Sequence, residues 1–238
     1  MRPLLAQARL ELTLLARNGE SLLLTLGIPI LLLVFFANVD VLPIEGKPIA
    51  FLAPGVLALA VLSTSFVNLA IATGFEREYG VLKRLGATPL GRPRLLAAKT
   101  GSILVVELVQ IAVLWVIALA LGWHPSASAG FVVAVLLGTI ACAGLGMCLA
   151  GSLKALVTLA AANGLYLVLL LLSGMVIPLA KLPGPVRALA RALPSGALAD
   201  AVRGSLTTGE GVPGRAWAVL AAWAVGAPIV ATRLFRWE

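Results

Sequence analysis

Few residues in this sequence carry groups that could take part in chemistry, and they form no recognisable catalytic arrangement. The single histidine, His124, lies between Trp123 and Pro125 with no Cys, Asp or Glu beside it. Cys142 and Cys148 are six positions apart in one apolar run, which fits neither a metal site nor a disulfide framework. The GxSxG motif of nucleophilic hydrolases and the HExxH motif of zinc proteases do not occur. Neither a catalytic site nor a metal site is therefore expected on this chain.

A phosphate-binding loop for ATP is also missing from the sequence. The fragment nearest to a Walker A motif is Gly46-Lys47, where Val41 stands at the position of the first glycine. Pro48 stands where the motif needs a Ser or Thr to bind magnesium. If ATP drives this protein, the ATPase must be another chain.

One acidic residue lies inside an apolar stretch. Glu107 is followed three residues later by Gln110, so a helix places both side chains on the same face. An acid in the hydrocarbon region costs about 2.5–3.5 kcal/mol on insertion scales, and it usually faces a bundle interior or an aqueous cavity. Two interpretations stay open, which are a contact on a substrate pathway and an interhelical hydrogen bond.

The composition is that of a membrane protein. Hydrophobic residues make up 61% of the 238 residues and charged residues 12%, and the mean hydropathy is +1.05. Soluble domains carry about 25% charged residues and disordered chains are poor in apolar residues, so both classes are excluded. Charge-free runs near membrane-spanning length alternate with clusters of Arg, Lys, Pro and Gly. This pattern predicts an all-α protein that crosses the membrane several times.

Six stretches approach the length of about 17–25 apolar residues that a membrane-spanning helix needs. The first and last are the weakest, because Pro29 interrupts the first and the last has sixteen residues with Pro228 near its end. A surface helix over residues 1–20 is predicted before the first span. The chain, 1–238, is thus expected to form one transmembrane domain with spans at 21–37, 51–73, 100–121, 130–150, 155–177 and 216–231.

Small residues mark one face of the fourth span. Cys142, Gly146 and Ala150 recur every four residues. Such a face lets helices approach closely, so tight packing inside the bundle is predicted there.

Basic residues predict the orientation of the chain. With six spans both termini lie on the same side, and the segments on that side, which include the 74–99 loop, carry twelve Lys and Arg against six on the other side. Positive-inside bias places both termini and the 74–99 loop in the cytoplasm and 178–212 outside. The net charge of +8 is explained by loops that face anionic lipid, so membrane lipid rather than nucleic acid is the expected partner.

The segment 178–212 is the basic piece that disagrees with this orientation. Apolar residues recur at helical spacing before and after Pro194, with Arg187 and Arg191 on another face of the first half and Arg203 in the second half. Two short helices are predicted that lie in the interface or dip into the outer leaflet. A solvated loop is the alternative.

The cytoplasmic stretch 75–94 is the most informative part of the chain. Residues 76–85 are predicted to form one short charged helix with Leu82 and Leu85 on one side, and Thr88 and Pro89 predict a turn after it. A rigid charged helix between two spans is a suitable contact for a cytoplasmic partner. A merely charged inside loop is the alternative.

The run REYGVLKRLGATPL at 77–90 strongly resembles the loop that follows the second span in permeases of ABC-2-type transporters, where the pattern is R-E-x-G-x-L-x-R-L-x-A-T-P-L. The resemblance extends over nearly the whole chain. It includes a surface helix, six spans, an apolar span that ends in SGMVIP, and then Pro194 and Arg203 before the last span. The short final span and the tryptophans around it are minor departures.

This resemblance implies the membrane subunit of an exporter in the bacterial plasma membrane, with both termini cytoplasmic. It would move a hydrophobic or amphipathic molecule such as a drug, an antibiotic or a lipid. ATP and magnesium would be bound by a separate nucleotide-binding subunit, so this chain would have no cofactor and no ATPase activity of its own. A second permease subunit, identical or paralogous, would complete the complex. The residues expected to contact the ATPase are Glu76, Arg77, Glu78, Gly80, Leu82, Lys83, Arg84, Leu85, Thr88 and Pro89.

The alternative function is a carrier or channel outside the ABC class. A carrier should show several ionisable residues within the membrane or an internal repeat, and neither is present. A membrane enzyme is disfavoured further, because converging catalytic groups are missing.

Overall fold

The computed structural model describes residues 19–39, 48–86, 91–126, 128–176, 178–207 and 211–235 of the chain. Within these ranges all regular elements are helical, which confirms the predicted all-α class. The surface helix predicted over 1–20 lies almost entirely outside the described residues. The elements are α2 (Gly19–Asn38), α3 (Pro48–Leu62), the π-helix η1 (Ser63–Asn68), α4 (Leu69–Glu78), α5 (Val81–Gly86), α6 (Arg92–Ala120), α7 (Ala129–Ser152), α8 (Ala155–Leu172), the 3₁₀ turn η2 (Leu179–Lys181), α9 (Gly184–Ala192), α10 (Pro194–Leu206) and α11 (Gly214–Leu234).

Among the described residues, five helices are long and apolar enough to cross a membrane. Four of them are α6, α7, α8 and α11, and the fifth is the continuous helix Pro48–Glu78 that α3, η1 and α4 form together. The apolar part of α2 that is described, Thr25–Asn38, is shorter than a span. The structure therefore supports five spans, and the first expected span at 21–37 stays a prediction.

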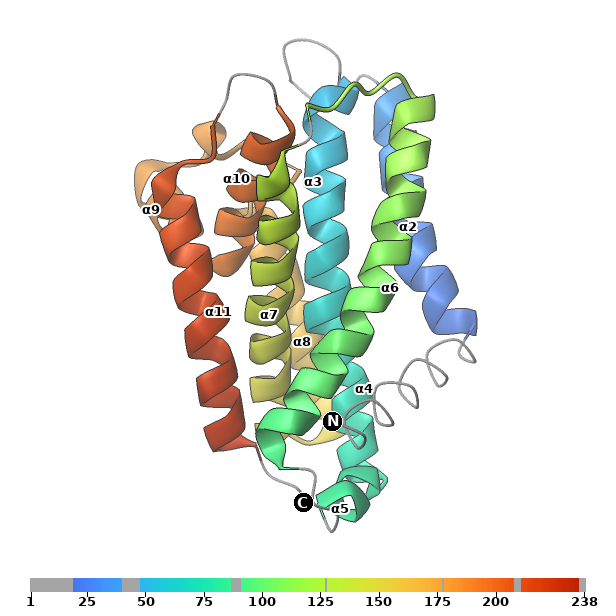
Figure 1. Cartoon of the computed structure of the whole chain (residues 1–238), viewed down its shortest axis with the longest axis vertical. Coiled ribbons are helices and arrows are strands. Elements are labelled where there is room, and N and C mark those ends of the chain that lie inside the picture. The colour runs from blue at the N-terminus through green and yellow to red at the C-terminus, as the bar shows by residue number, and fades with distance from the viewer. Residues whose placement is uncertain are drawn as a thin grey trace.

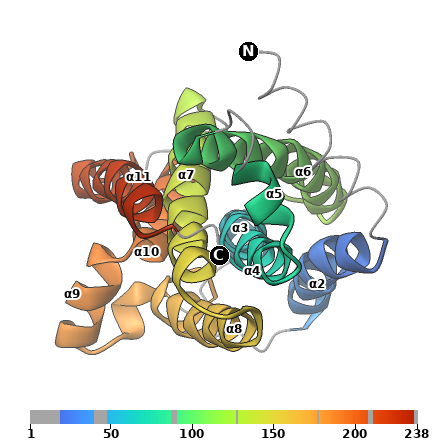
Figure 2. The same cartoon turned by 90° about the horizontal axis from the view of Figure 1, so that it is seen from below.

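The helices stand side by side around a central pair (Figures 1 and 2). The pair consists of α7 and the helix Pro48–Glu78, and α6, α2, α8 and α11 surround it. α3 is buried along nearly its whole length, whereas α8 exposes a long apolar face. One end of the bundle carries α5 and the other carries α9, and these ends are called the α5 end and the α9 end below.

The predicted fifth span is too long at its C-terminal side. α8 ends at Leu172, not at 177, because Gly174 has a φ of +76° and turns the chain out of the helix. The turn then packs on α3, where a Cβ on Gly55 would lie 2.2 Å from the Met175 carbonyl oxygen. The apolar run predicted a helix up to residue 177. Apolar residues are buried equally well in a turn that packs on the bundle, so hydrophobicity alone does not show where the helix ends.

The small residues of α7 pack closely against neighbouring helices, as predicted. A Cβ on Gly146 would lie 2.7 Å from the backbone oxygen of Phe66 in η1. On another face, a Cβ on Gly144 would lie 2.7 Å from the backbone nitrogen of Pro228 in α11. α7 therefore touches both neighbours with its backbone almost in contact with theirs.

We expect Gly146→Leu to lower the amount of folded protein in the membrane several-fold. The leucine would meet backbone rather than a movable side chain, and overpacking a tight interface costs about 1–3 kcal/mol. Gly226→Leu in α11 is the matched control, because a Cβ there meets nothing within 4 Å. Fluorescence-detected size exclusion would measure both variants, and equal amounts of the two would contradict the packing argument.

Candidate functional site

The helix predicted over 76–85 divides into two. α4 ends at Glu78, and Gly80 follows with a φ of +71° while its N–H donates to the Arg77 carbonyl at 3.0 Å. Such a left-handed glycine ends a helix at low energetic cost, and α5 then starts in a new direction. The prediction of one helix was therefore wrong. Gly80 is the residue in the sequence that indicates the end of the first helix.

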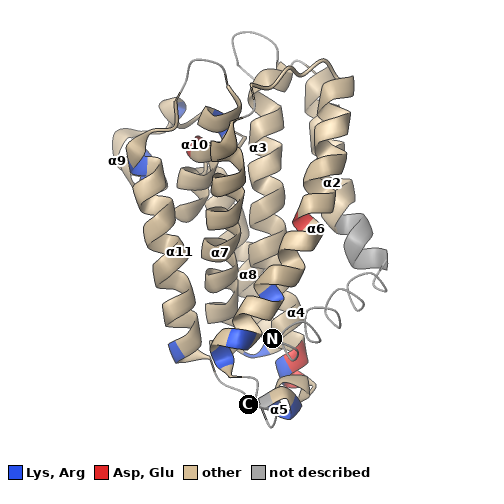
Figure 3. Ribbon diagram, viewed as in Figure 1, with Lys and Arg blue, Asp and Glu red and all other residues tan. Residues whose placement is uncertain are grey.

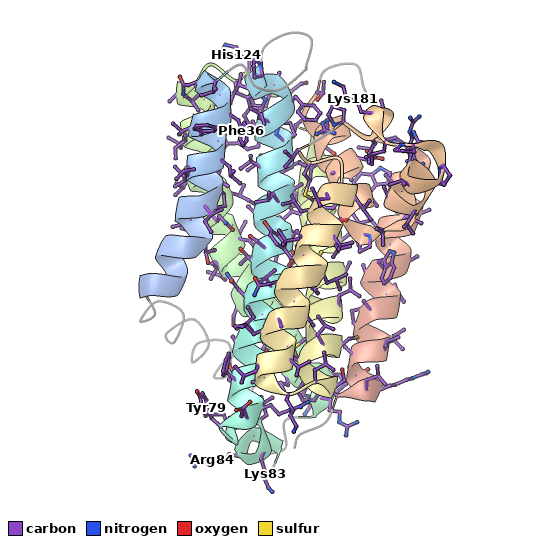
Figure 4. All side chains as sticks on the ribbon, turned by 180° about the vertical axis from the view of Figure 1, so that it is seen from behind. Phe36, Tyr79, Lys83, Arg84, His124 and Lys181 are labelled. Atoms are coloured by element: carbon purple, nitrogen blue, oxygen red, sulfur yellow. The ribbon has the colours of Figure 1, made fainter. Side chains whose placement is uncertain are left out.

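α5 presents a polar and partly aromatic surface at its end of the bundle (Figure 4). Tyr79 is 72% exposed and Val81 is 40% exposed, and both Lys83 and Arg84 are exposed. These four residues are called the α5 face below. Leu82 points the other way and is fully buried in an apolar cluster with α6 and α7 residues. Leu85 is partly buried and packs against the same cluster, so α5 is held on the bundle by two leucines. Thr88 and Pro89 lie outside the described residues.

Three charged residues in the last turn of α4 form bonds to neighbouring helices of the bundle. The carboxylate of Glu76 pairs with the Lys99 ammonium of α6 at 2.7 Å. The Arg77 guanidinium donates to the carbonyls of Ala150 and Leu153, at 3.0 and 2.7 Å, where α7 turns into α8. Glu76, Arg77 and Glu78 are called the α4 clasp below.

Glu78 completes the clasp at the start of α8. Its carboxylate accepts a hydrogen bond from the backbone N–H of Ala155 at 3.2 Å, the first residue of that helix. A carboxylate is favoured there because the first N–H groups of a helix lack partners within it and carry partial positive charge. Through the clasp, α4 is bonded to α6, α7 and α8 at once.

Lys99 was predicted to be a charge of the 74–99 loop, and this prediction was wrong. Lys99 is 1% exposed and belongs to the buried face of α6. Helical spacing indicates that Lys99 is buried, because it lies three or four residues from other residues of the buried face. These residues are Leu95, Leu96, Ser102 and Ile103.

Glu107 and Gln110 both lie inside the bundle. Glu107 is fully buried, and the Thr139 hydroxyl of α7 donates to its Oε2. Gln110 accepts from the Thr64 hydroxyl at 2.9 Å and donates to the Thr25 carbonyl at 2.6 Å, so it joins α6 to η1 and α2. The geometry favours the interhelical interpretation, and the role of Glu107 is taken up below as a proposal.

The described part of the segment 178–212 forms two helices that meet at Pro194, as predicted, and they differ in burial. α9 is largely exposed with Arg191 at its surface, whereas almost all of α10 is buried in the bundle. Arg203 donates to the Gly174 carbonyl at 3.1 Å and lies 4.2 Å above the Phe51 ring. A solvated loop is therefore the wrong interpretation of this segment.

The other arginine contacts of this segment are also internal. Arg187 donates to the carbonyls of Ala180 and Leu182 at 2.6 and 2.9 Å. Arg215 pairs with Asp200 at 3.1 Å; burial raises the pKa of the Asp200 carboxyl above its ordinary value, and the arginines around it partly offset this. These contacts fix the shape of the α9 end and leave no catalytic arrangement among the described residues there.

A cavity with polar walls opens between α2, η1 and α8. Its volume is about 260 Å³, and its polar lining includes Ser63, Asn68, Asn163 and Tyr166. Asn68 donates to the Thr25 hydroxyl at 2.8 Å across the cavity wall. It is called the α2–α8 cavity below, and the sequence analysis did not predict it because its residues come from three separate helices. In the part of the chain that the structure describes, no cluster of His, Cys, Asp and Glu could hold a metal ion.

Long apolar helices around a buried centre define a multi-pass helical membrane protein. The profile of the ABC-2 type transporter family matches residues 4–207, and the chain belongs to this family. Among curated proteins no sequence matches the chain significantly.

Proposed function

We propose that this chain is the permease subunit of an ATP-binding cassette exporter in the bacterial plasma membrane, with the α5 end in the cytoplasm. The observation that carries the proposal is the α5 face itself, which is exposed while the α4 clasp beneath it is bonded to three spans. The chain has no phosphate-binding loop, so a separate ATPase would have to act through such a surface.

The geometry supports a mechanical role for this end of the chain. Closure of a docked ATPase dimer would displace α5, and Leu82 and the α4 clasp would pass that displacement to α6, α7 and α8. Because packed helices shift between discrete arrangements, a small movement at α5 is able to favour a second state of the bundle. The difference in the ATPase's affinity for the two states supplies the free energy.

The substrate and the second permease copy are assigned to the same side of the bundle. The α2–α8 cavity combines apolar walls with hydroxyl and amide groups, which suits an amphipathic molecule. α8 beside it exposes Leu156, Leu167 and Leu171 together with the polar Asn163. A second copy that covers this face would enclose the cavity between two chains.

Glu107 is assigned an architectural role in this proposal. Its bond to Thr139 joins α6 to α7, and both of these helices contact the π-helix η1. Irregular π turns are frequent at functional sites. A polar tie at that depth would keep the two helices in register while the bundle moves.

The test is reconstitution with and without an ATPase. Purified alone in lipid nanodiscs, the chain is expected neither to bind ATP nor to hydrolyse it. Co-expressed with a nucleotide-binding subunit encoded beside it, the complex is expected to show vanadate-sensitive hydrolysis. Vanadate-sensitive turnover by the isolated chain would refute the assignment, and so would an inability to form a complex with any such ATPase.

A further inference from the structure

A groove runs along the outside of the bundle between α6 and α11, on the α5 half. Both helices pack on α7 but diverge from each other, and the space between them has a volume of about 550 Å³. Its walls are almost entirely apolar. The α6 wall includes Leu96, Ala97, Gly101 and Leu104, and the α11 wall includes Pro228 and Thr232.

The length of this α6–α11 groove fits one acyl chain. On α6 it reaches from Pro93 to Leu104, which are eleven steps apart along the helix, and at 1.5 Å per step this is about 16 Å. One leaflet contributes about half of a hydrocarbon core of about 30 Å. The groove thus has the depth of a single leaflet and stops near the middle of the membrane.

Basic residues lie in the turns of α6 and α11 next to the α5 end of the groove. Arg92 lines a small hollow that shares Leu96 and Thr232 with the groove. Arg94 and Arg233 are exposed in the first turn of α6 and the last turn of α11 (Figure 3). None of the described residues that line either space is acidic. A molecule with an apolar tail and a negatively charged head therefore matches both the walls and the mouth.

Gly101 shows that the groove is open toward an outside molecule. A Cβ added there would meet no other atom of the described chain within 4 Å, although the residue lies in the middle of α6. By contrast, a Cβ on Gly144 or Gly146 of α7 would meet the backbone of a neighbouring helix. Among the described residues none fills the space at Gly101, so it is open to an occupant there.

We propose that the α6–α11 groove is a binding site for an anionic phospholipid. One acyl chain lies along Gly101 and Leu104, and the phosphate is held by Arg92 and Arg233, since guanidinium groups bind phosphate in bidentate fashion. The lipid belongs to the leaflet at the α5 end, and the basic residues there favour anionic over zwitterionic headgroups. The site lies apart from the α2–α8 cavity, because the two spaces share no lining residue.

The test uses native mass spectrometry of the full chain, purified without an ATPase from vesicles of phosphatidylcholine and phosphatidylglycerol with identical acyl chains. The blocking variant is Gly101→Leu, which fills the groove without a clash. Ala112→Leu is its control, because 11 residues later it lies on the same face of α6 but in the other leaflet, and it is exposed. Arg92→Gln with Arg233→Gln removes the headgroup contacts.

The wild-type chain and Ala112→Leu are expected to retain phosphatidylglycerol in preference to phosphatidylcholine. Gly101→Leu should retain at least about fivefold less of either lipid, and the double arginine variant should keep lipid but lose the preference. Equal retention by Gly101→Leu and Ala112→Leu would overturn the proposal, as would a wild-type chain with no preference. A change in oligomeric state in Gly101→Leu would also overturn it, since the groove would then be a protein interface. None of these outcomes depends on the assignment as an ATP-driven permease.

Discussion

Charge reversal at Lys83 and Arg84 is expected to remove the ATPase from the complex while the permease stays folded. Both side chains are exposed on the α5 face and lie outside the apolar core. Losing close charge pairs at an interface costs about 2–5 kcal/mol, and each 1.4 kcal/mol is a factor of ten, so co-purification of the ATPase should fall at least about tenfold. Membrane abundance should stay near normal, because exposed charges contribute only about 0–1 kcal/mol to folding.

The matched control for Lys83→Glu with Arg84→Glu is Lys181→Glu with Arg191→Glu. These two residues are also exposed and basic, but they lie at the α9 end (Figure 4 labels Lys181). The ratio of ATPase to permease after affinity purification would be measured for both double variants. If both variants retain the ATPase equally, the α5 face is only a charged loop end and has no docking role.

Glu76→Gln is expected to cause the largest loss of stability among changes at the α4 clasp. Lys99 is buried, and the change removes the carboxylate that its ammonium group contacts at 2.7 Å. Breaking a buried ion pair costs up to about 3–5 kcal/mol, because the compensation of the remaining charge is weakened. Lys99→Met should be milder, since the Glu76 side chain that it leaves behind is 19% exposed and reaches water.

The double variant Glu76→Gln with Lys99→Met separates folding from coupling. It removes both charges, so abundance and thermal stability should recover relative to Glu76→Gln alone. The α5 face is unchanged, so the ATPase should still bind. ATP-driven transport should nevertheless fall, because α4 has lost its bond to α6. Normal ATP-driven transport by a fully assembled complex of this variant would contradict the claim that the Glu76–Lys99 ion pair transmits movement from α4 to α6.

The sequence predicted the helical class because charge-free runs of spanning length report directly on the membrane environment. It also predicted the close packing of α7 and the break at Pro194, since small residues and proline act locally. The division at Gly80 was local too, and it was missed because the helical pattern of residues 76–85 was given more weight than one glycine.

The inward bonds of the α4 clasp were not predictable in the same way. Glu78 was expected to contact a partner, but its bond to Ala155 joins residues 77 positions apart. Lys99 and Glu76 likewise come from different helices. The hydrophobic pattern shows which face of a helix is buried, but it does not show which polar group of another helix lies opposite. The α2–α8 cavity and the α6–α11 groove depend on the same long-range packing.

Cross-linking from the α5 face tests the central claim most directly. With Cys142 and Cys148 replaced by alanine, a single cysteine would be placed at Arg84 or, as the control, at Lys181, and a short bifunctional reagent added to native membranes that contain both subunits. A cross-link to the nucleotide-binding subunit from position 84 and none from position 181 is the predicted result. Cross-linking from position 181, or none from position 84 in a complex that hydrolyses ATP, would contradict the claim that the ATPase acts through α5.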